Sequence, residues 1–186
     1  VLLRAGGVPP DRIAVLDPHD RPLARFTGLA ESVGFRFLRS PSVHHLDLDP
    51  YSLRTFIARR GLAPRDAYAA PYDRPAWSCF LAHTAETLSP LPLDRLWRRG
   101  TALALSGVRG GYAVDTIRGR LEARRVVLAI GGTGAPHWPV WAPKGSARVR
   151  HVFEPAATPL PDGPLIVVGG GISAAQVACR EAEAGR

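Results

Sequence analysis

The chain has 186 residues, an apolar fraction of 46% and a formal net charge of +8. This length suits one domain, or one domain with a piece of a second, and the apolar content can supply a core. No apolar run reaches the roughly 18 residues of a membrane span. Cys79 and Cys179 form no CxxC motif, which excludes a disulfide framework and argues against a metal site; we expect both to be small buried apolar residues.

The positive charge comes from arginines that are scattered along the chain, in pairs such as Arg59-Arg60 and Arg124-Arg125. Clustered cations bind the phosphate backbone of nucleic acids, but no longer basic block is present here. The pattern therefore argues against a nucleic-acid surface. The N-terminal residues lack the pattern of a secretory signal, so we expect a cytoplasmic protein with no membrane partner.

The first elements in chain order are the end of a helix and a strand. Residues 1–10 have the composition of a last helical turn closed by two glycines and two prolines. Residues 12–18 (RIAVLDP) are apolar and β-branched and predict a short buried strand that Asp17 and Pro18 end. Residues 19–48 predict short extended stretches rather than an amphipathic helix.

Two helices are predicted next. In residues 49–61, Asp49 is a candidate N-cap and Pro50 suits the first helical position, while Gly61 provides the stop. The apolar face of this helix consists of Leu53, Phe56 and Ile57. Residues 76–88 (AWSCFLAHTAETL) predict a second helix whose inward side chains are Trp77, Phe80, Leu81 and Leu88.

From Leu103 the apolar period changes to that of strands separated by glycines. Residues 103–130 predict a β-meander whose last strand, Val126 to Ile130, is continuous and buried on both faces. A proline-rich linker, Glu154 to Pro164, then indicates a domain boundary. We therefore predict one domain over residues 1–163 and the start of another over residues 164–186.

The closing stretch carries the strongest motif. Leu165 to Val168 predict a strand, and a glycine turn and a helix follow it in the order that a dinucleotide-binding unit requires. The first glycine permits a tight turn, the second lets the backbone approach a pyrophosphate, and the free helical amides face the anion. The candidate residues of this turn are Gly169, Gly170, Gly171, Ser173 and Ala174.

Asp17 is a second candidate residue for nucleotide binding. In a dinucleotide fold, an acid at the end of the second strand accepts hydrogen bonds from ribose hydroxyls, about 20 residues after the glycine motif. The alternative is an aspartate that only starts a turn before Pro18. Counting back from Asp17 places its glycine motif before residue 1, and counting forward from Gly169 places its ribose-binding residue beyond Arg186. The chain also contains no methionine, so we expect it to be an internal piece that is cut at both ends.

These segments together resemble flavoproteins with two dinucleotide-binding domains, the class of the flavin monooxygenases and the lysine or ornithine N-hydroxylase-like proteins. Residues 12–18, the meander with its returning strand, and LIVVGGGISAAQVA carry the resemblance; the middle of the chain matches in order only. It implies an α/β fold, in which a Rossmann-like FAD-binding domain with a β-meander leads into a nested NAD(P)-binding Rossmann domain. VVLAIGGTG resembles the turn of this family that passes close to FAD, and the matching positions are Gly131, Gly132, Thr133 and Gly134.

Other polar and aromatic residues carry weaker signals. His44 and His45 are adjacent, so at most one of them can face a flavin or substrate; a structural or solvated role suits the pair better, and the ligands are too few for a metal. Asp47 and Asp49 suit turn and cap roles. Trp138 and Trp141 suggest aromatic packing after the glycine turn, and no Ser-His-Asp spacing stands out.

The expected function is hydride transfer from NAD(P)H to FAD, which oxygen-dependent hydroxylation of a small substrate at nitrogen or carbon could follow. In this scheme the cofactors perform the chemistry, so binding residues are named and no catalytic acid, base or nucleophile is assigned. Two alternatives stay open. The protein could be a flavin-dependent nucleic-acid-modifying or RNA-binding protein, or the isolated chain could be inactive and poorly soluble because one βα half and its glycine loop are missing.

Overall fold

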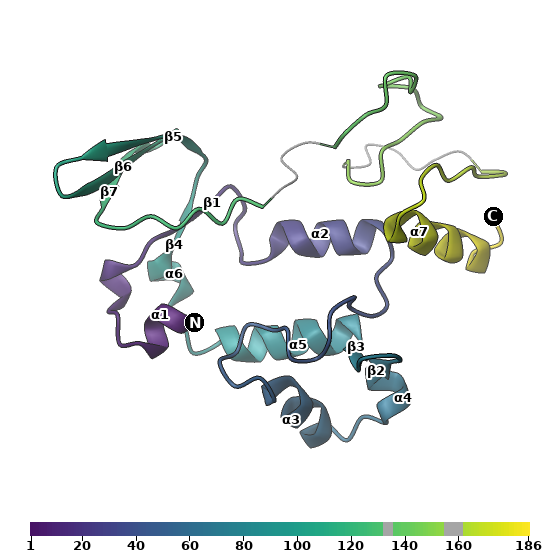
Figure 1. The fold of residues 1–186 in the computed structure, drawn as a ribbon, viewed down its shortest axis with the longest axis horizontal. Coiled ribbons are helices and arrows are strands. Elements are labelled where there is room, and N and C mark those ends of the chain that lie inside the picture. Colours follow the sequence, from purple (N-terminus) through teal and green to yellow (C-terminus); the bar gives the residue numbers. More distant parts are fainter. Residues whose placement is uncertain (132–135, 155–161) are drawn as a thin grey trace. The chain divides into compact units, whose positions relative to one another are not determined.

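The computed structural model describes residues 1–131, 136–154 and 162–186. The chain is a mixed α and β protein with small sheets, in agreement with the predicted α/β class (Figure 1). The helices are α1 Leu2–Ala5, the 3-10 helix η1 Pro10–Arg12, α2 Ala24–Ser32, α3 Ser52–Arg59, α4 Pro64–Ala67, α5 Trp77–Leu88, α6 Leu93–Leu96 and α7 Ile172–Glu183. The strands are β1 Val15–Asp17, β2 Tyr68–Ala69, β3 Arg74–Pro75, β4 Trp97–Arg99, β5 Ala102–Val108, β6 Gly111–Thr116 and β7 Gly119–Ala123.

The chain forms two compact units, which we describe separately. The first consists of Val1–Pro22, Phe35–Leu105 and Val114–Arg120, and the second of Leu23–Gly34, Ser106–Ala113 and Leu121–Arg186. The predicted boundary between residues 163 and 164 stays a prediction.

The first unit contains a parallel pair of strands, β1 and β4, with Val15 opposite Trp97 and Asp17 opposite Arg99. The predicted strand over residues 12–18 is therefore present but is shorter, because residues 10–12 form η1 instead. It is also less buried than expected, since Val15 is 39% exposed. Because the two strands are parallel and in register, their last residues, Asp17 and Arg99, lie side by side at the carboxyl end of this sheet.

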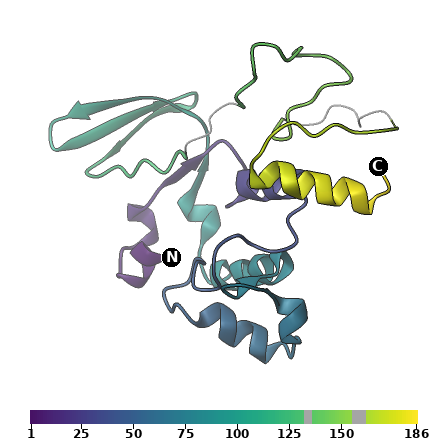
Figure 2. The ribbon, with the colours of Figure 1, turned by 45° about the vertical axis from the view of Figure 1, so that its right-hand side comes forward.

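The core of the first unit lies between α3 and α5, which pack side by side (Figure 1, Figure 2). The predicted apolar face of α3 is confirmed: Leu53, Phe56 and Ile57 are 0%, 3% and 3% exposed. The helix begins later than predicted. Its N-cap is Tyr51, and the carboxylate of Asp49 instead accepts a hydrogen bond from the N–H of Tyr51 at 2.9 Å.

The core cluster also includes Ala67, Ala76 and Cys79, so the expected burial of this cysteine is confirmed. Of the predicted inward residues of α5, Phe80 is buried, whereas Trp77, Leu81 and Leu88 are only half-buried. The expected burial of Cys179 is wrong, because this residue is exposed on α7.

The second unit contains α2, a helix that the sequence did not predict, and α7. The guanidinium of Arg180 on α7 donates to the carbonyl of Ser32, the last residue of α2, at 2.8 Å. It also donates two hydrogen bonds to Glu181, which is 6% exposed and pairs with Arg186 as well. The Arg180–Ser32 bond connects the two helices, and it places a cation at the C-terminal end of α2, which is stabilising.

Strands β5, β6 and β7 form the predicted meander in chain order. The two turns between them span only two residues each, which requires antiparallel neighbours. The predicted last strand, Val126 to Ile130, is absent from the described structure: β7 ends at Ala123, and Val126 to Ile130 are neither in a strand nor buried. Val127 is 85% exposed and Ile130 is 78% exposed.

The predicted strand Leu165 to Val168 is also absent from the described structure. Its side chains alternate as in an extended chain, with Leu165 half-buried, Ile166 86% exposed, Val167 half-buried and Val168 69% exposed. An apolar pattern predicts a strand only where a neighbouring strand can accept its hydrogen bonds, and the described structure pairs none with this segment.

The α3–α5 core yields a first prediction. Replacing Leu53 by Ala should lower the free energy of unfolding by about 2–5 kcal/mol, because a fully buried leucine leaves a cavity. The matched control is Leu62→Ala, since Leu62 is 43% exposed and its replacement should cost less than about 1 kcal/mol. Urea unfolding measures both variants, and equal losses would contradict the assigned core.

Candidate functional site

The glycine turn before α7 is the first candidate site. The helix that the sequence predicts after the glycine turn is present as α7. Gly171 is its N-cap, and the carbonyl of Gly171 accepts from the N–H of Ala175 at 3.2 Å. The N–H groups of Ile172, Ser173 and Ala174 precede this first helical hydrogen bond, so they have no acceptor within the helix. Within the described part of the chain, no side chain caps them. The start of α7 therefore presents hydrogen-bond donors with the positive end of a helix dipole behind them.

The glycines of this turn differ in what the backbone requires of them. Gly169 has a φ of +141°, which disfavours any other residue, and a Cβ there would lie 3.4 Å from that of Ala174. Gly171 has a φ of −88°, and a Cβ at Gly170 or Gly171 would meet nothing within 4 Å. The fold thus needs glycine at position 169 for its turn, whereas at 171 it leaves open space before the helix.

Asp17 lies at the carboxyl end of β1, where the sequence places it. Its Oδ1 accepts from the N–H of His19 at 2.8 Å, and its carbonyl accepts from the N–H of Gly100 at 2.8 Å. The side chain is half-buried. The carboxylate therefore stabilises the turn at Pro18 by binding the N–H of His19. This is the purely structural role of Asp17 that the sequence analysis left open.

An open pocket lies in the first unit, and its lining begins with residues 20–22, shortly after Asp17 in the sequence. Its volume is about 370 Å³. It is lined by Asp20, Arg21, Pro22, Leu93, Asp94, Trp97 and Arg99. The indole of Trp97 is fixed there by a 2.9 Å hydrogen bond from its Nε1 to the carbonyl of His19. The pocket therefore combines an aromatic wall with two arginines and two aspartates.

The other predicted cofactor positions are only partly described. Gly131 is exposed, has a φ of +67°, and a Cβ there would meet no atom of the described residues within 4 Å. Gly132, Thr133 and Gly134 lie outside the described residues. Their predicted role near FAD stays a prediction.

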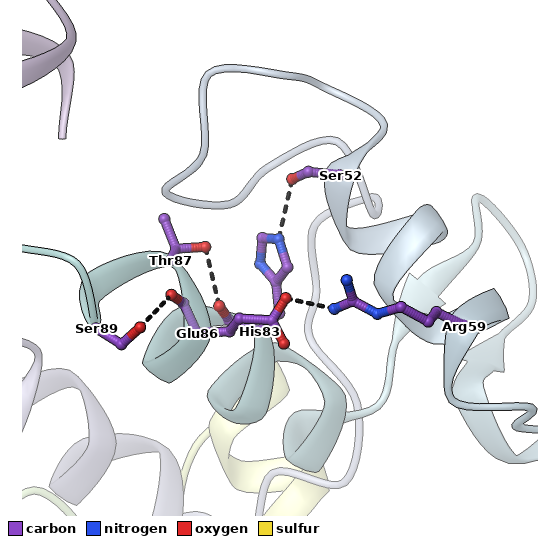
Figure 3. Close-up of polar contacts among 6 residues, drawn as sticks. All are labelled: Ser52, Arg59, His83, Glu86, Thr87 and Ser89. Atoms are coloured by element: carbon purple, nitrogen blue, oxygen red, sulfur yellow. Dashed lines mark hydrogen bonds and ion pairs between the residues drawn. The ribbon is translucent and has the colours of Figure 1, made fainter.

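A second cluster, which the sequence did not single out, lies between α3 and α5 (Figure 3). The Nε2 of His83 lies 2.9 Å from the Oγ of Ser52, the first residue of α3. His83 is 3% exposed, and its ring packs edge-on against His45 at 4.9 Å and Phe56 at 5.6 Å between centroids. Its Nδ1 is buried and has no hydrogen-bond partner in the described structure.

The loop before α3 completes this cluster. Asp47 accepts hydrogen bonds from the N–H groups of Leu48 and Asp49, at 2.6 and 3.4 Å, and interacts with the hydroxyl of Ser52. Burial raises the pKa of Asp47, but these hydrogen bonds outweigh it, so the net pKa lies below the usual value. Asp47 therefore stays ionised at neutral pH and holds the loop as the predicted turn residue.

The arrangement of these three residues differs from that of a catalytic triad. A triad places the carboxylate on the Nδ1 of the histidine, so that Ser, His and Asp follow one another. Here Asp47 interacts with the serine instead, and the Nδ1 of His83 has no carboxylate among the described residues. The histidine is buried and packs edge-on against the rings of His45 and Phe56. The cluster is thus a buried polar network, and it gives no activated nucleophile.

His44 and His45 differ, as expected of neighbours in the chain. His44 is exposed, whereas His45 packs on His83 and accepts from the N–H of Asp47 at 3.1 Å. Trp138 donates to Glu154 at 2.6 Å and packs against His151, in accordance with the expected aromatic packing. The same expectation is wrong for Trp141, which is 69% exposed.

One sequence signal could have identified the buried network. His83 lies three residues after Phe80, on the same face of the predicted helix, so a polar ring on an apolar face was visible. Its partner could not be found in this way, because Ser52 lies 31 positions earlier and only tertiary packing brings the two together.

Among residues 1–131, 136–154 and 162–186, no group of three or more His, Cys, Asp or Glu side chains is placed to hold a metal ion. None of the helices within these same ranges is long and apolar enough to cross a membrane. The chain matches no protein-family model, no curated protein and no solved structure. Any function must therefore be argued from the residues themselves.

The buried network yields a second prediction. Replacing Ser52 by Ala removes the partner of His83 Nε2 and one hydrogen bond of Asp47, so we expect the free energy of unfolding at neutral pH to fall by about 1–3 kcal/mol. Ser89→Ala is the control, because Ser89 is exposed at the end of α5 and its loss should cost about 0.5 kcal/mol or less. Denaturant unfolding of both variants measures the difference, and a smaller loss for Ser52→Ala than for the control would contradict the network.

Proposed function

We propose that the chain belongs to an FAD- and NAD(P)H-dependent oxidoreductase of the monooxygenase-like type, built on Rossmann-like FAD- and NAD(P)-binding domains. The observation that carries the proposal is the turn Gly169-x-Gly171-x-x-Ala174 at the N-terminus of α7. When bound, the two cofactors supply hydride transfer from nicotinamide to flavin and, with oxygen, the hydroxylation of a small substrate.

The glycine turn fits a pyrophosphate. The N–H groups of Ile172, Ser173 and Ala174 can donate to phosphate oxygens, and the helix dipole favours the negative charge. Gly170 and Gly171 leave the approach open, because no described atom lies within 4 Å of the place of a Cβ. The role of these residues is to bind and orient the NAD(P)H diphosphate, and they transfer no proton.

The pocket after β1 supports the FAD part of the proposal. In open parallel sheets, ligands bind outside the carboxyl ends of the strands. Asp17 ends β1 and Arg99 ends β4, and Arg99 and Trp97 line the pocket. We assign this pocket to the adenosine end of FAD, where Trp97 can stack on a base. Asp17 does not line the pocket but ends β1 opposite Arg99, which does; its Oδ1 accepts from His19, and the other carboxylate oxygen can accept from a ribose hydroxyl.

The test is binding of NADPH and NADH to the 186-residue chain by calorimetry. Gly171→Asp places a carboxylate where the pyrophosphate would lie. We expect it to weaken nucleotide binding at least tenfold, by charge repulsion and by occupying the amides. Its effect on the fold should be neutral or slightly stabilising, because aspartate is a preferred N-cap and Gly171 has an ordinary φ.

The matched control is Gly28→Asp on α2, an exposed glycine whose added Cβ would also meet nothing within 4 Å. It adds the same charge to the chain and should leave nucleotide affinity unchanged. Absence of binding to the wild type, or equal binding by both variants, would overturn the assignment of the glycine turn.

A further inference from the structure

His83 has a buried nitrogen that no described group satisfies. The ring is 3% exposed, and its Nδ1 is among the buried atoms without a hydrogen-bond partner. A buried polar atom of this kind costs free energy, and the cost is much larger if the atom carries a proton and a charge. The ring is therefore held in its neutral state by its surroundings.

The hydrogen bonds show what a charged ring would meet. The Nε2 of His83 shares a hydrogen bond with the Oγ of Ser52, and a hydroxyl can serve as its donor or its acceptor. The charged ring carries a proton on both nitrogens. Its N–H at Nδ1 would be buried with no acceptor among the described residues.

The charged and titratable groups around the ring come from three segments. The loop before α3 contributes His45 and the carboxylate of Asp47, and α5 contributes Glu86, which pairs with Arg59 of α3 (Figure 3). The Arg59–Glu86 pair is exposed, so it adds little to the stability of the contact. The two carboxylates favour a charged ring, whereas burial and the neighbouring His45 oppose it.

We propose that the contact between α3 and α5 is an acid-sensitive switch, in which protonation of His83 releases α3 and the loop before it from α5. The charged imidazolium cannot stay packed against Phe56 and His45 without an acceptor for its N–H at Nδ1. When α3 and its loop separate from α5, water can accept the hydrogen bond of the N–H at Nδ1. The same movement exposes the apolar face of α3, which consists of Leu53, Phe56 and Ile57.

The direction of the pH effect follows from the same geometry. Burial, and secondly the neighbouring His45, lower the pKa of His83 below its ordinary value of 6.5, despite the opposing effects of Asp47 and Glu86. Below that pH the open form binds a proton at His83 that the closed form does not. The closed contact is therefore fully stable above the ordinary value and loses stability as the pH falls, by up to about tenfold in its equilibrium constant per pH unit.

Hydrogen exchange of the wild-type chain at about pH 7.5 and 5.5, corrected for intrinsic exchange rates, tests the proposal. Peptides from α3 and α5 should lose protection at the lower pH, while peptides from β5 to β7 provide the reference. His83→Phe keeps a ring in place, leaves Ser52 paired with Asp47 and removes the proton site. This variant should keep its protection at both pH values.

The control is His44→Gln, which removes an exposed neighbouring histidine and should leave the pH effect unchanged. Proton NMR of the wild-type chain provides a second measurement that needs no variant, since the His83 ring should titrate below its ordinary pKa, together with the loss of protection. Equal loss of protection in the wild type and His83→Phe, or an ordinary pKa of His83, would overturn the proposal. Loss of the pH effect in His44→Gln would overturn it as well.

Discussion

The packing of α3 on α5 is the constraint on which the first unit depends. Leu53, Phe56 and Ile57 are almost fully excluded from water, and the short strands β2 and β3 offer little further burial. Because each buried aliphatic side chain contributes about 1.5–3 kcal/mol, this one contact supplies a large part of the stability of a small core. A polar group inside this core is therefore costly unless it forms hydrogen bonds. His83 forms one through Nε2, whereas its Nδ1 has no partner among the described residues.

The placement of Asp47 decides what this polar group can do. A carboxylate on Nδ1 would fix the histidine as a base and stabilise its charged form. The carboxylate instead interacts with Ser52, and no carboxylate among the described residues bonds to Nδ1. The same three residue types thus give a histidine that resists protonation rather than one that accepts a proton during catalysis. Chemistry follows from the order of the hydrogen bonds, and the residue types alone do not determine it.

Local signals in the sequence predicted local structure well. The apolar spacing of α3, the left-handed Gly61 after it, the meander and the helix after Gly171 all depend on neighbours in the chain, and all are present. Strands that depend on distant partners were predicted less well. Val126 to Ile130 and Leu165 to Val168 have the composition of buried strands, but their backbone groups find no ladder in the described structure. Hydropathy records the tendency to be buried, whereas a strand also needs an edge to pair with. The Ser52–His83 contact likewise depends on a distant partner, so residue spacing could not predict it.

The glycines show how a requirement of the fold can be separated from that of a ligand. Gly61 and Gly169 have positive φ values, which explains them without any ligand. Gly171 has neither a positive φ nor a close neighbour, but Gly28 and Gly107 share these properties, so freedom from constraint alone does not indicate a binding site. Position separates Gly171 from those two, because α7 begins there and no side chain of the described residues caps its first amides. A side chain there would cost the fold nothing and would lie in the path of an anion. The argument for a nucleotide therefore depends on Gly171, a position where the fold itself does not require glycine.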